Sequence, residues 1–312
     1  MGQGWRETVE SLRDELGQVI RGRQEAVELL LTGILAGGHV LLEDVPGVGK
    51  TTLAKALAKI LSVDFTRVQF TPDLLPADIL GSQVLNPRDG SLSFRKGPIF
   101  TNVLLADEIN RASPRTQSAL LEAMNEGQVS IEGTTHQLPS PFFVLATQNP
   151  VDFQGTYPLP EAQLDRFLLR FGVGYPEAED EIEILFAHQA AAPLDSVEPV
   201  AGIEDLLGMM EAVRRVVVKR EVAAYLLKLV EASRNHPRLS LGVSTRGALS
   251  YFRAAQARSF LCGRSYMSPD DLQQLAVPVL AHRIQLNSEA RYGGQTASSI
   301  LAEIVAEVPV PL

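Results

Sequence analysis

The chain has 312 residues, 45% of them hydrophobic, and a formal net charge of −9 at pH 7. This length suits one large or two modest domains, and the hydrophobic content is ample for a packed core. The acidic balance, without a cluster of Lys and Arg among aromatic residues, disfavours nucleic acid as the default partner. Cys262 is the only cysteine, which excludes an intrachain disulfide and a cysteine-based metal site and fits a reducing compartment.

The amino-terminal part of the sequence predicts no leader and no membrane anchor. Residues 1–7 lack the apolar core of a signal peptide. The most apolar window, 29–42, is interrupted by glycines and by His39 and is too short to span a bilayer. We therefore expect a cytoplasmic protein without membrane insertion.

Two helices are expected before the first strand. The first ends at Gly22, and the second covers about 24–36. The apolar run at 40–42 then predicts a short buried strand. The apolar residues whose spacing indicates the first helix are Val9, Leu12, Leu16 and Val19.

A turn that contains two glycines follows this strand and opens a helix. Gly47 and Gly49 permit the tight turn that lets backbone N–H groups converge on phosphate oxygens, and the helix terminus adds partial positive charge. Lys50 is then expected to reach the β- and γ-phosphates of a nucleoside triphosphate, and the Thr51 hydroxyl to ligate Mg²⁺. Asp44 stands where the phosphate-loop pattern has glycine. The alternative is an ordinary strand–turn–helix with Lys50 in solvent.

Two carboxylates end the apolar run at 103–106. Acidic groups at the end of a buried strand are costly unless something cationic faces them. Mg²⁺ and an attacking water supply that need, with Asp107 holding the metal and Glu108 orienting or deprotonating the water. A strand that simply ends in solvent is the alternative.

Asn149 follows a third apolar run, at 142–147, and is a candidate for positioning the attacking water. A neutral hydrogen-bonding group suits that role because it holds water without competing for the metal. Asn149-Pro150 also favours a turn, and the two interpretations are compatible.

Strands alternate with helices through about residue 173, which predicts a parallel sheet covered on both faces. Ligands of such sheets bind at the carboxyl ends of the strands, where Lys50, Asp107 and Asn149 fall. Two segments interrupt the alternation, 71–97 and 127–140, and the second predicts a β-hairpin.

The carboxyl-terminal part is expected to be all helical. Its predicted helices cover 219–236, 246–262 and 268–284, and Ser268-Pro269 is a strong helix start. We therefore expect three parts, which are an α/β core at 1–175, an acidic helix and linker at 176–200, and a smaller helical domain at 201–312.

Seven strings of the sequence resemble the MoxR family of AAA+ ATPases, and the likeness extends from about Val19 to Arg283. They are FTRVQFTPDLLP at 65–76, KGPIF at 96–100, DEINRA at 107–112, LLEAM at 120–124, ATQNP at 146–150, LPEAQLDRF at 159–167 and VPVLAHR at 277–283. The resemblance implies an AAA+ αβα core with a five-stranded parallel sheet, followed by a helical lid, with the nucleotide between core and lid. Segment 71–97 matches the family's helix-two insertion, and both inserted segments are expected to face a central pore or client.

The same resemblance implies roles for individual residues. Lys50 and Thr51 match Walker A, Asp107 and Glu108 match Walker B, and Asn149 matches sensor 1. The residues expected to bind the adenine and the phosphates are Val19, Ile20, Gly22, Pro46, Gly47, Val48, Gly49, Lys50, Thr51 and Thr52.

Two arginines are assigned by resemblance as well. Arg166 matches the arginine finger offered to the ATP of a neighbouring subunit, and Arg246 matches sensor 2 at the start of a lid helix. A guanidinium suits the finger because it is planar, always charged and bidentate. An ion pair between Arg166 and Asp165 or Glu161 of its own subunit is the alternative, and the role of Arg115 stays open.

The family resemblance implies an ATP- and Mg²⁺-dependent ring, expected to be a hexamer of this chain. Such ATPases act in a chaperone-like way with von Willebrand factor A-domain proteins to mature or activate client enzymes or complexes, often metal-dependent ones. Two alternatives stay open, a nucleic-acid-dependent motor and a slow ATP-gated binding switch.

Overall fold

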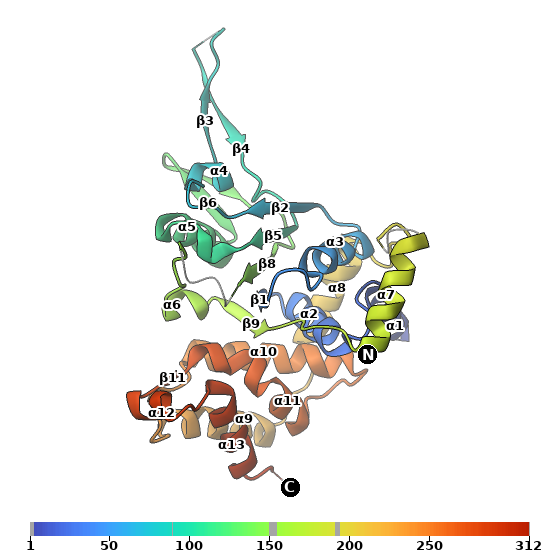
Figure 1. The fold of residues 1–312 in the computed structure, drawn as a ribbon, viewed down its shortest axis with the longest axis vertical. Coiled ribbons are helices and arrows are strands. Elements are labelled where there is room, and N and C mark those ends of the chain that lie inside the picture. The colour runs from blue at the N-terminus through green and yellow to red at the C-terminus, as the bar shows by residue number, and fades with distance from the viewer. Residues whose placement is uncertain (1–2, 89, 150–154, 191–193, 312) are drawn as a thin grey trace.

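A parallel five-stranded sheet forms the centre of the computed structural model, which describes residues 3–88, 90–149, 155–190 and 194–311 (Figure 1). The expected parallel sheet is confirmed, with each strand running parallel to its neighbours. The order across the sheet is β2 (Phe65–Gln69), β5 (Val103–Asp107), β8 (Phe143–Gln148), β1 (His39–Glu43) and β9 (Phe167–Phe171).

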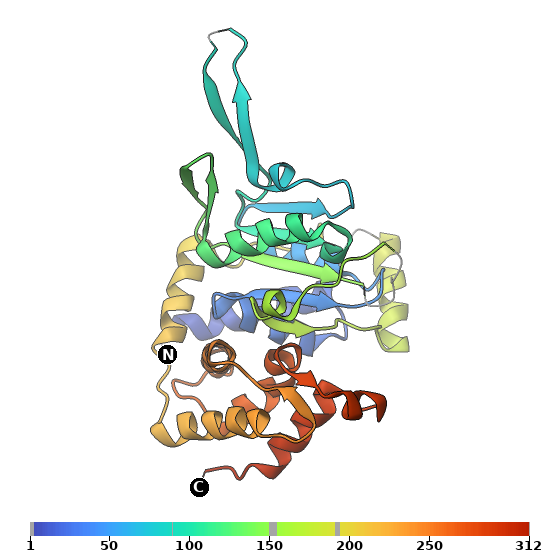
Figure 2. The ribbon, with the colours of Figure 1, turned by 90° about the vertical axis from the view of Figure 1, so that its left-hand side faces the viewer.

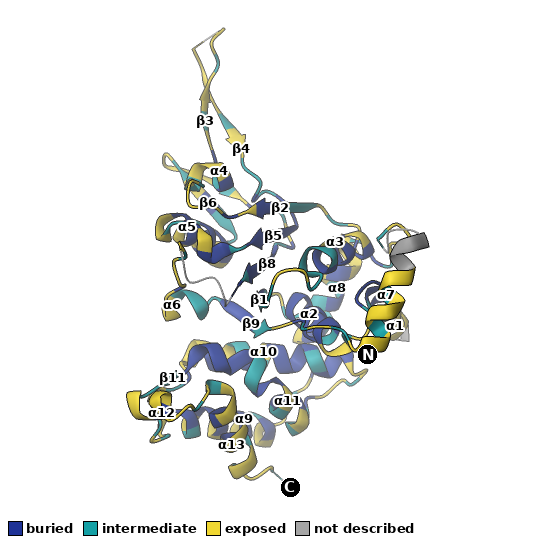
Figure 3. Ribbon diagram, in the orientation of Figure 1, coloured by how far each residue is buried: buried dark blue, intermediate teal, exposed yellow. Residues whose placement is uncertain are grey.

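Both faces of the sheet are buried, which explains why its central strands are continuous apolar runs. Along β5, Leu104 and Ala106 pack into one apolar cluster, whereas Val103 and Leu105 pack into the other. The first cluster includes residues of α5 (Pro114–Glu126), and the second includes residues of α1 (Gln3–Val19), α2 (Gln24–Leu35) and α3 (Lys50–Ile60). Burial is thus greatest in the sheet and in the helices that cover it (Figure 3).

Two hairpins leave the core between strands of the sheet (Figure 2). The first follows α4 (Pro76–Leu80) and pairs β3 (Gly81–Leu85) with β4 (Leu92–Lys96). The second pairs β6 (Gln128–Ile131) with β7 (Thr134–Gln137) and is the hairpin predicted from the sequence. Phe94 of the first and His136 of the second stack with ring centroids 4.0 Å apart, so the two hairpins are in direct contact.

The carboxyl-terminal part is mostly helical, as expected, but not wholly so. β10 (Leu239–Leu241) and β11 (Gln285–Leu286) form an antiparallel pair that the prediction of an all-helical domain missed. Asn287 fixes this pair, because its backbone N–H donates to the Arg238 carbonyl and its side chain donates to the Pro237 carbonyl. The helices of this part are α8 (Ile203–Arg214), α9 (Arg220–Arg234), α10 (Thr245–Leu261), α11 (Pro269–Leu280), α12 (Ser288–Tyr292) and α13 (Ala297–Glu307).

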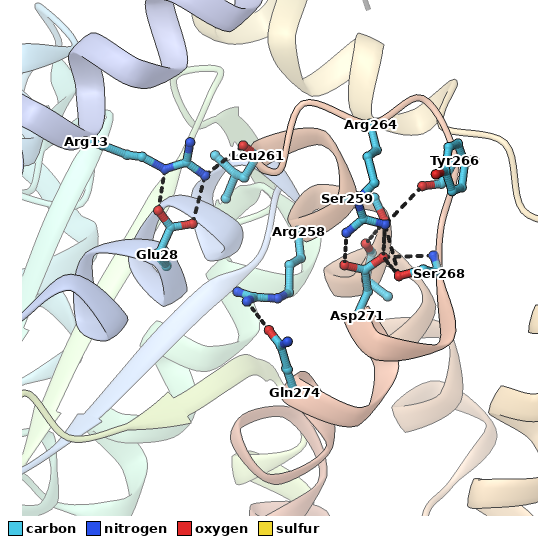
Figure 4. A network of polar contacts seen from close by, with 11 residues as sticks. Arg13, Glu28, Arg258, Ser259, Leu261, Arg264, Tyr266, Ser268, Asp271 and Gln274 are labelled. Carbon is cyan, nitrogen blue, oxygen red and sulfur yellow. Dashed lines mark hydrogen bonds and ion pairs between the residues drawn. The ribbon is translucent and has the colours of Figure 1, made fainter. Parts of the chain in front are cut away.

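The expected helix over 268–284 is shorter in the structure. α11 ends at Leu280, and the chain continues as a 3-10 turn, η2 (Ala281–Arg283). The predicted start is confirmed, since Ser268 and Asp271 form a capping box with Pro269 in the first turn. Asp271 is also the partner of Arg264, so this corner is held by an ion pair between a buried carboxylate and a half-buried arginine (Figure 4).

The two main parts of the chain pack together through α2 and α10. Arg13 on α1 links them, because it pairs with Glu28 on α2 and its Nη2 donates to the Leu261 carbonyl at 2.7 Å (Figure 4). α8 also contacts both α2 and α10. The domain limits at 175 and 201 stay a prediction.

The acidic helix predicted after the core is α7 (Ala178–Ala190), which carries Glu179, Asp180 and Glu181 in its first turn. It lies beyond the carboxyl ends of the strands, whereas the β6–β7 hairpin lies toward the opposite end of the sheet (Figure 2). None of the helices in the described part of the chain is both long and apolar enough to cross a bilayer.

Candidate functional site

The predicted phosphate loop lies between the end of β1 and the start of α3. Gly47 and Gly49 have φ of +89° and +88°, a left-handed conformation that residues with a Cβ rarely adopt. These two glycines therefore allow the turn that brings backbone N–H groups to the amino terminus of α3, where anions bind favourably. The Lys50 ammonium donates to the Asp44 carbonyl at 2.7 Å, so the loop folds over its own lysine.

Asp44, the departure from the phosphate-loop pattern, has a defined structural role. One carboxylate oxygen accepts the Val45 N–H at 2.8 Å, and the other accepts the Gly174 N–H at 2.6 Å. The side chain thereby ties the start of the loop to the segment that follows β9. Because Asp44 does not adopt a positive φ, the position does not require glycine.

The two carboxylates predicted to act with the phosphate loop stand at the end of β5. Asp107 is buried, and its Oδ1 accepts a 2.6 Å hydrogen bond from the Thr147 hydroxyl on β8. The same hydroxyl accepts the Glu108 N–H at 2.8 Å. Glu108 has φ of +57°, an uncommon conformation for a residue other than glycine, which persists only where surrounding contacts impose it.

Two polar residues of β2 hold these carboxylates. Arg67 donates to Asp107 Oδ2 at 2.7 and 3.1 Å, and the Gln69 side chain donates to Glu108 Oε2 at 2.8 Å. Neither residue is among the site residues predicted from the sequence. Arg67 and Gln69 are two residues apart on a strand with few apolar residues, so their side chains point to the same face of the sheet. This spacing is the sequence signal that could have placed both near the site. The cation expected to face Asp107 is therefore, in this structure, a side chain of the protein.

These groups line one cavity of about 410 Å³. Burial lowers the pKa of the Lys50 ammonium below its usual value, an effect that the carboxylates of Asp44, Asp107 and Glu108 oppose. Thr51 and Asp107 offer the oxygen ligands that Mg²⁺ prefers, so the residues present fit this metal. The lining residues are Pro46, Gly47, Gly49, Lys50, Thr51, Thr52, Arg67, Gln69, Asp107, Glu108 and Asn149.

A second cavity, of about 340 Å³, adjoins the loop on the side expected to bind adenine. It includes Val19, Ile20, Gly47, Val48 and Gly49. Gly22, the remaining residue predicted to bind adenine, does not line it.

α7 covers this cavity. Arg21 pairs with Glu183 at 3.3 Å, and a Cβ added at Gly22 would lie only 1.9 Å from the Asp180 carboxylate. Among the described residues, none beyond 200 lines either cavity, whereas a third cavity, of about 500 Å³, lies between Gly22 on the core side and Gln274 and Val277 of the lid. The expectation that the nucleotide lies between core and lid therefore stays a prediction. The lid itself packs on α2 and β9.

Arg166 lies at the amino ends of the strands, whereas Lys50 lies at their carboxyl ends. It precedes Phe167, the first residue of β9, which pairs with His39, the first residue of β1. Lys50 instead follows the carboxyl end of β1. Within the described residues, the Arg166 side chain makes no hydrogen bond or ion pair, and the alternative pair with Asp165 does not form.

Arg246 also lies at the amino ends of the strands. It is half exposed on the first turn of α10, donates to Asn125 Oδ1 at 2.6 Å and lies 3.9 Å from the Asp165 carboxylate. Asn125 follows Met124, whose carbonyl contacts the His39 ring at 3.0 Å. The structure therefore brings together Lys50, Thr51, Asp107, Glu108 and Asn149, but it does not bring Arg166 or Arg246 to the phosphate loop of their own chain.

Known protein families match both the core and the helical part of the chain. A family model described as the ATPase family associated with various cellular activities matches residues 39–169, and a model of the AAA lid domain matches residues 231–304. The chain is 48% identical to the uncharacterized protein YeaC of Bacillus subtilis, over 96% of this chain and 93% of that protein. It is 38% identical to the chaperone MoxR1 of Mycobacterium tuberculosis, over 97% of this chain and 82% of that protein.

A solved structure is similar over nearly the whole length. The crystal structure of an ATPase candidate from Cytophaga hutchinsonii superposes with a TM-score of 0.92 at 39% identity, covering 99% of this chain and 96% of that one. The fold and the phosphate site thus define the class of this protein, which is an AAA+ ATPase that binds nucleotide. Within that class, the chain belongs to the MoxR family.

Proposed function

We propose that this ATPase works as a ring of identical subunits, most simply a hexamer, in which each ATP is completed by the neighbouring subunit. The observation that supports this proposal is that Lys50 lies at the carboxyl ends of the strands and Arg166 at their amino ends. A head-to-tail arrangement brings the side of one subunit that carries Arg166 against the side of the next that carries Lys50, and it forms a ring when the rotation between successive subunits closes. Arg166 of one copy can then reach the phosphates bound by Lys50 of another.

The residues of the cavity divide the chemistry among them. Lys50 and the loop N–H groups bind the β- and γ-phosphates, and Thr51 and Asp107 hold Mg²⁺. The metal, when bound, neutralises charge on the phosphate oxygens. Glu108 accepts a proton from the attacking water, and Asn149 orients that water. Arg166 from the neighbour stabilises charge on the transferred phosphoryl group, an effect worth about a thousandfold or more in rate.

The two hairpins are the proposed client-binding elements of the ring. Val84, Leu85 and Leu92 on the β3–β4 hairpin are exposed by 41, 59 and 63%, and exposed apolar surface of this kind marks interaction sites. The stacked rings of Phe94 and His136 join this hairpin to the β6–β7 hairpin. We expect both hairpins to move as one unit when the core changes conformation during hydrolysis.

The proposed activity is chaperone-like remodelling of partner proteins. One relative is named a chaperone, and the family resemblance supports partners with a von Willebrand factor A domain and clients that are enzymes or complexes, often metal-dependent. The acidic net charge of −9 favours protein over nucleic acid as the client. We place this activity in the cytoplasm.

An affinity pull-down with Glu108→Gln, loaded with ATP and Mg²⁺, tests the proposal. This variant should bind ATP but scarcely hydrolyse it, and it should therefore hold clients in the engaged state. Recovery of a von Willebrand A-domain protein or a metalloenzyme, lost in Lys50→Ala, is the expected result. Recovery of nucleic acid in a nuclease-sensitive complex, with ATPase stimulation by DNA or RNA, would instead support a nucleic-acid motor.

A further inference from the structure

The side chain of Arg283 leaves the lid and enters the core next to Arg166. It comes from η2, and its side chain is only 2% exposed. Its Nε donates to Asp165 Oδ1 at 2.8 Å, and its Nη2 donates to the Phe167 carbonyl at 2.6 Å. Its Nη1 also reaches the Leu168 carbonyl, at 3.3 Å. One guanidinium thus binds the chain on both sides of Arg166.

This placement is built for a guanidinium. Burial lowers the pKa of Arg283 to about 10, and the Asp165 carboxylate opposes that effect. A buried charge is costly unless it is paired and hydrogen-bonded, and here the carboxylate and the backbone carbonyls meet that need. Gly247 on α10 leaves the necessary room, since a Cβ there would lie 2.9 Å from Arg283 Cδ. His282 adds a second contact, 3.1 Å from the Phe167 carbonyl.

Among the described residues, the finger residue between these contacts is itself lightly held. Arg166 is only half-buried, and its backbone N–H donates to the Gln163 carbonyl at 3.2 Å. Within the part of the chain that the structure describes, the Asp165 carboxylate has one more cationic neighbour, Arg246, at 3.9 Å. Both arginines that contact Asp165 therefore belong to the lid, while the finger itself belongs to the core.

We propose that Arg283 is a positioning residue for the arginine finger, and that through it the lid of one subunit sets the ATPase rate of its neighbour. This inference rests on the proposed role of Arg166 in the neighbouring site. Catalysis by such a finger depends on geometry, and a misplacement of about 1 Å can lower a rate by about a hundredfold. A change in the angle between lid and core shifts Arg283, and with it the backbone that carries Arg166.

Mixed rings separate the two roles of a subunit, as donor of the finger and as acceptor that hydrolyses ATP. Arg166→Ala subunits serve as acceptors, and Lys50→Ala subunits serve as donors; their mixture should regain ATPase activity. Replacing the donor by Lys50→Ala/Arg283→Met should lower the regained rate by about tenfold or more. Arg283→Lys in the same background should act alike, because one ammonium cannot replace the planar fork of donors.

Arg264 supplies the control, since it is a half-buried lid arginine that pairs with the buried Asp271 in the first turn of α11, whereas Arg283 follows the last turn of that helix. The Lys50→Ala/Arg264→Met donor should restore activity as well as Lys50→Ala does. Arg283→Met subunits with intact Lys50 should still accept the finger of Lys50→Ala subunits, with unchanged ATP affinity.

The outcomes are distinct. Full rescue by the Lys50→Ala/Arg283→Met donor overturns the positioning role. So does equal loss of the donor and acceptor roles in both Arg283 variants, since the residue would then support folding generally. If the mixture of Lys50→Ala and Arg166→Ala subunits, with Arg283 intact, regains no ATPase activity, the proposed role of Arg166 as the finger is overturned instead.

Discussion

The guanidinium of Arg67 donates two hydrogen bonds, of 2.7 and 3.1 Å, to one carboxylate oxygen of Asp107. The carboxylate that is expected to bind Mg²⁺ is therefore already paired with a cationic side chain of the protein. Metal binding must therefore displace Arg67 from Asp107 or share the carboxylate with it.

Arg67→Met should accordingly lower the Mg²⁺ concentration that gives half-maximal ATPase activity. We expect a shift of about two- to fivefold, because a partly exposed ion pair is worth about 1 kcal/mol or less. Magnesium titrations of the steady-state rate measure it. Arg253→Met, at an exposed position of α10, is the control and should leave the curve unchanged. A higher magnesium requirement in Arg67→Met would contradict the competition.

The depressed pKa of Lys50 predicts a pH dependence of ATP binding. The ammonium form binds phosphate, and burial lowers its pKa in the free protein. Bound triphosphate raises that pKa again, because an adjacent negative charge favours the charged form. Affinity should therefore fall as the pH rises through the lowered pKa, by up to about tenfold per pH unit. Titration with a fluorescent ATP analogue from neutral to alkaline pH tests this. An affinity that stays flat up to the ordinary lysine pKa would exclude the effect.

Glu108→Gln should separate binding from hydrolysis. Loss of a general base lowers a rate by about a hundred- to ten-thousandfold, while the phosphate contacts of Lys50 remain. Single-turnover hydrolysis and nucleotide binding should be measured side by side. Glu126→Gln, an exposed position on α5, is the matched control. Near-normal turnover in Glu108→Gln would remove Glu108 from the mechanism.

His39 predicts a loss of stability in acid. Burial lowers the pKa of His39 to about 4, and its Nδ1 accepts the Val144 N–H at 3.0 Å. The unfolded chain binds a proton near pH 6.5, whereas the folded protein does so only near pH 4. This contribution is present above pH 6.5 and is lost as the pH falls toward 4, by roughly 3 kcal/mol.

Chemical denaturation between pH 7 and 4 measures that loss. The pKa of buried His282 is also lowered, and it contributes with the same sign. His39→Gln should therefore flatten the curve in part. If His39→Gln and the parent protein lose stability in parallel over this range, the neutral buried ring is not the cause.

Much of the core could be predicted because local patterns and tertiary structure agree there. The apolar run that ends in Asp107 is fully buried, and Gly47 and Gly49 adopt the positive φ that a phosphate loop needs. The contacts that could not be predicted join residues that are far apart in the sequence. Arg67 faces Asp107 only because β2 pairs with β5, and Arg283 meets Asp165 across 118 residues.

Short strands in a helical region were missed for a similar reason. β11 has only two residues, Gln285 and Leu286, too few to show an alternating pattern. It pairs with Leu239 and Leu241, more than forty residues earlier in the chain, and Asn287 fixes that pairing. The lid placement likewise follows from packing on α2 and β9, which no local motif reveals.

The central claim is that one subunit's ATP is completed by the Arg166 of another. The most direct test measures ATPase activity per subunit over a range of protein concentrations, with the assembled mass recorded by light scattering on the same samples. The account predicts that activity rises in step with the fraction of rings and that isolated subunits bind ATP but hardly hydrolyse it. Dilute monomers that turn over ATP at the rate of the assembled protein would contradict it.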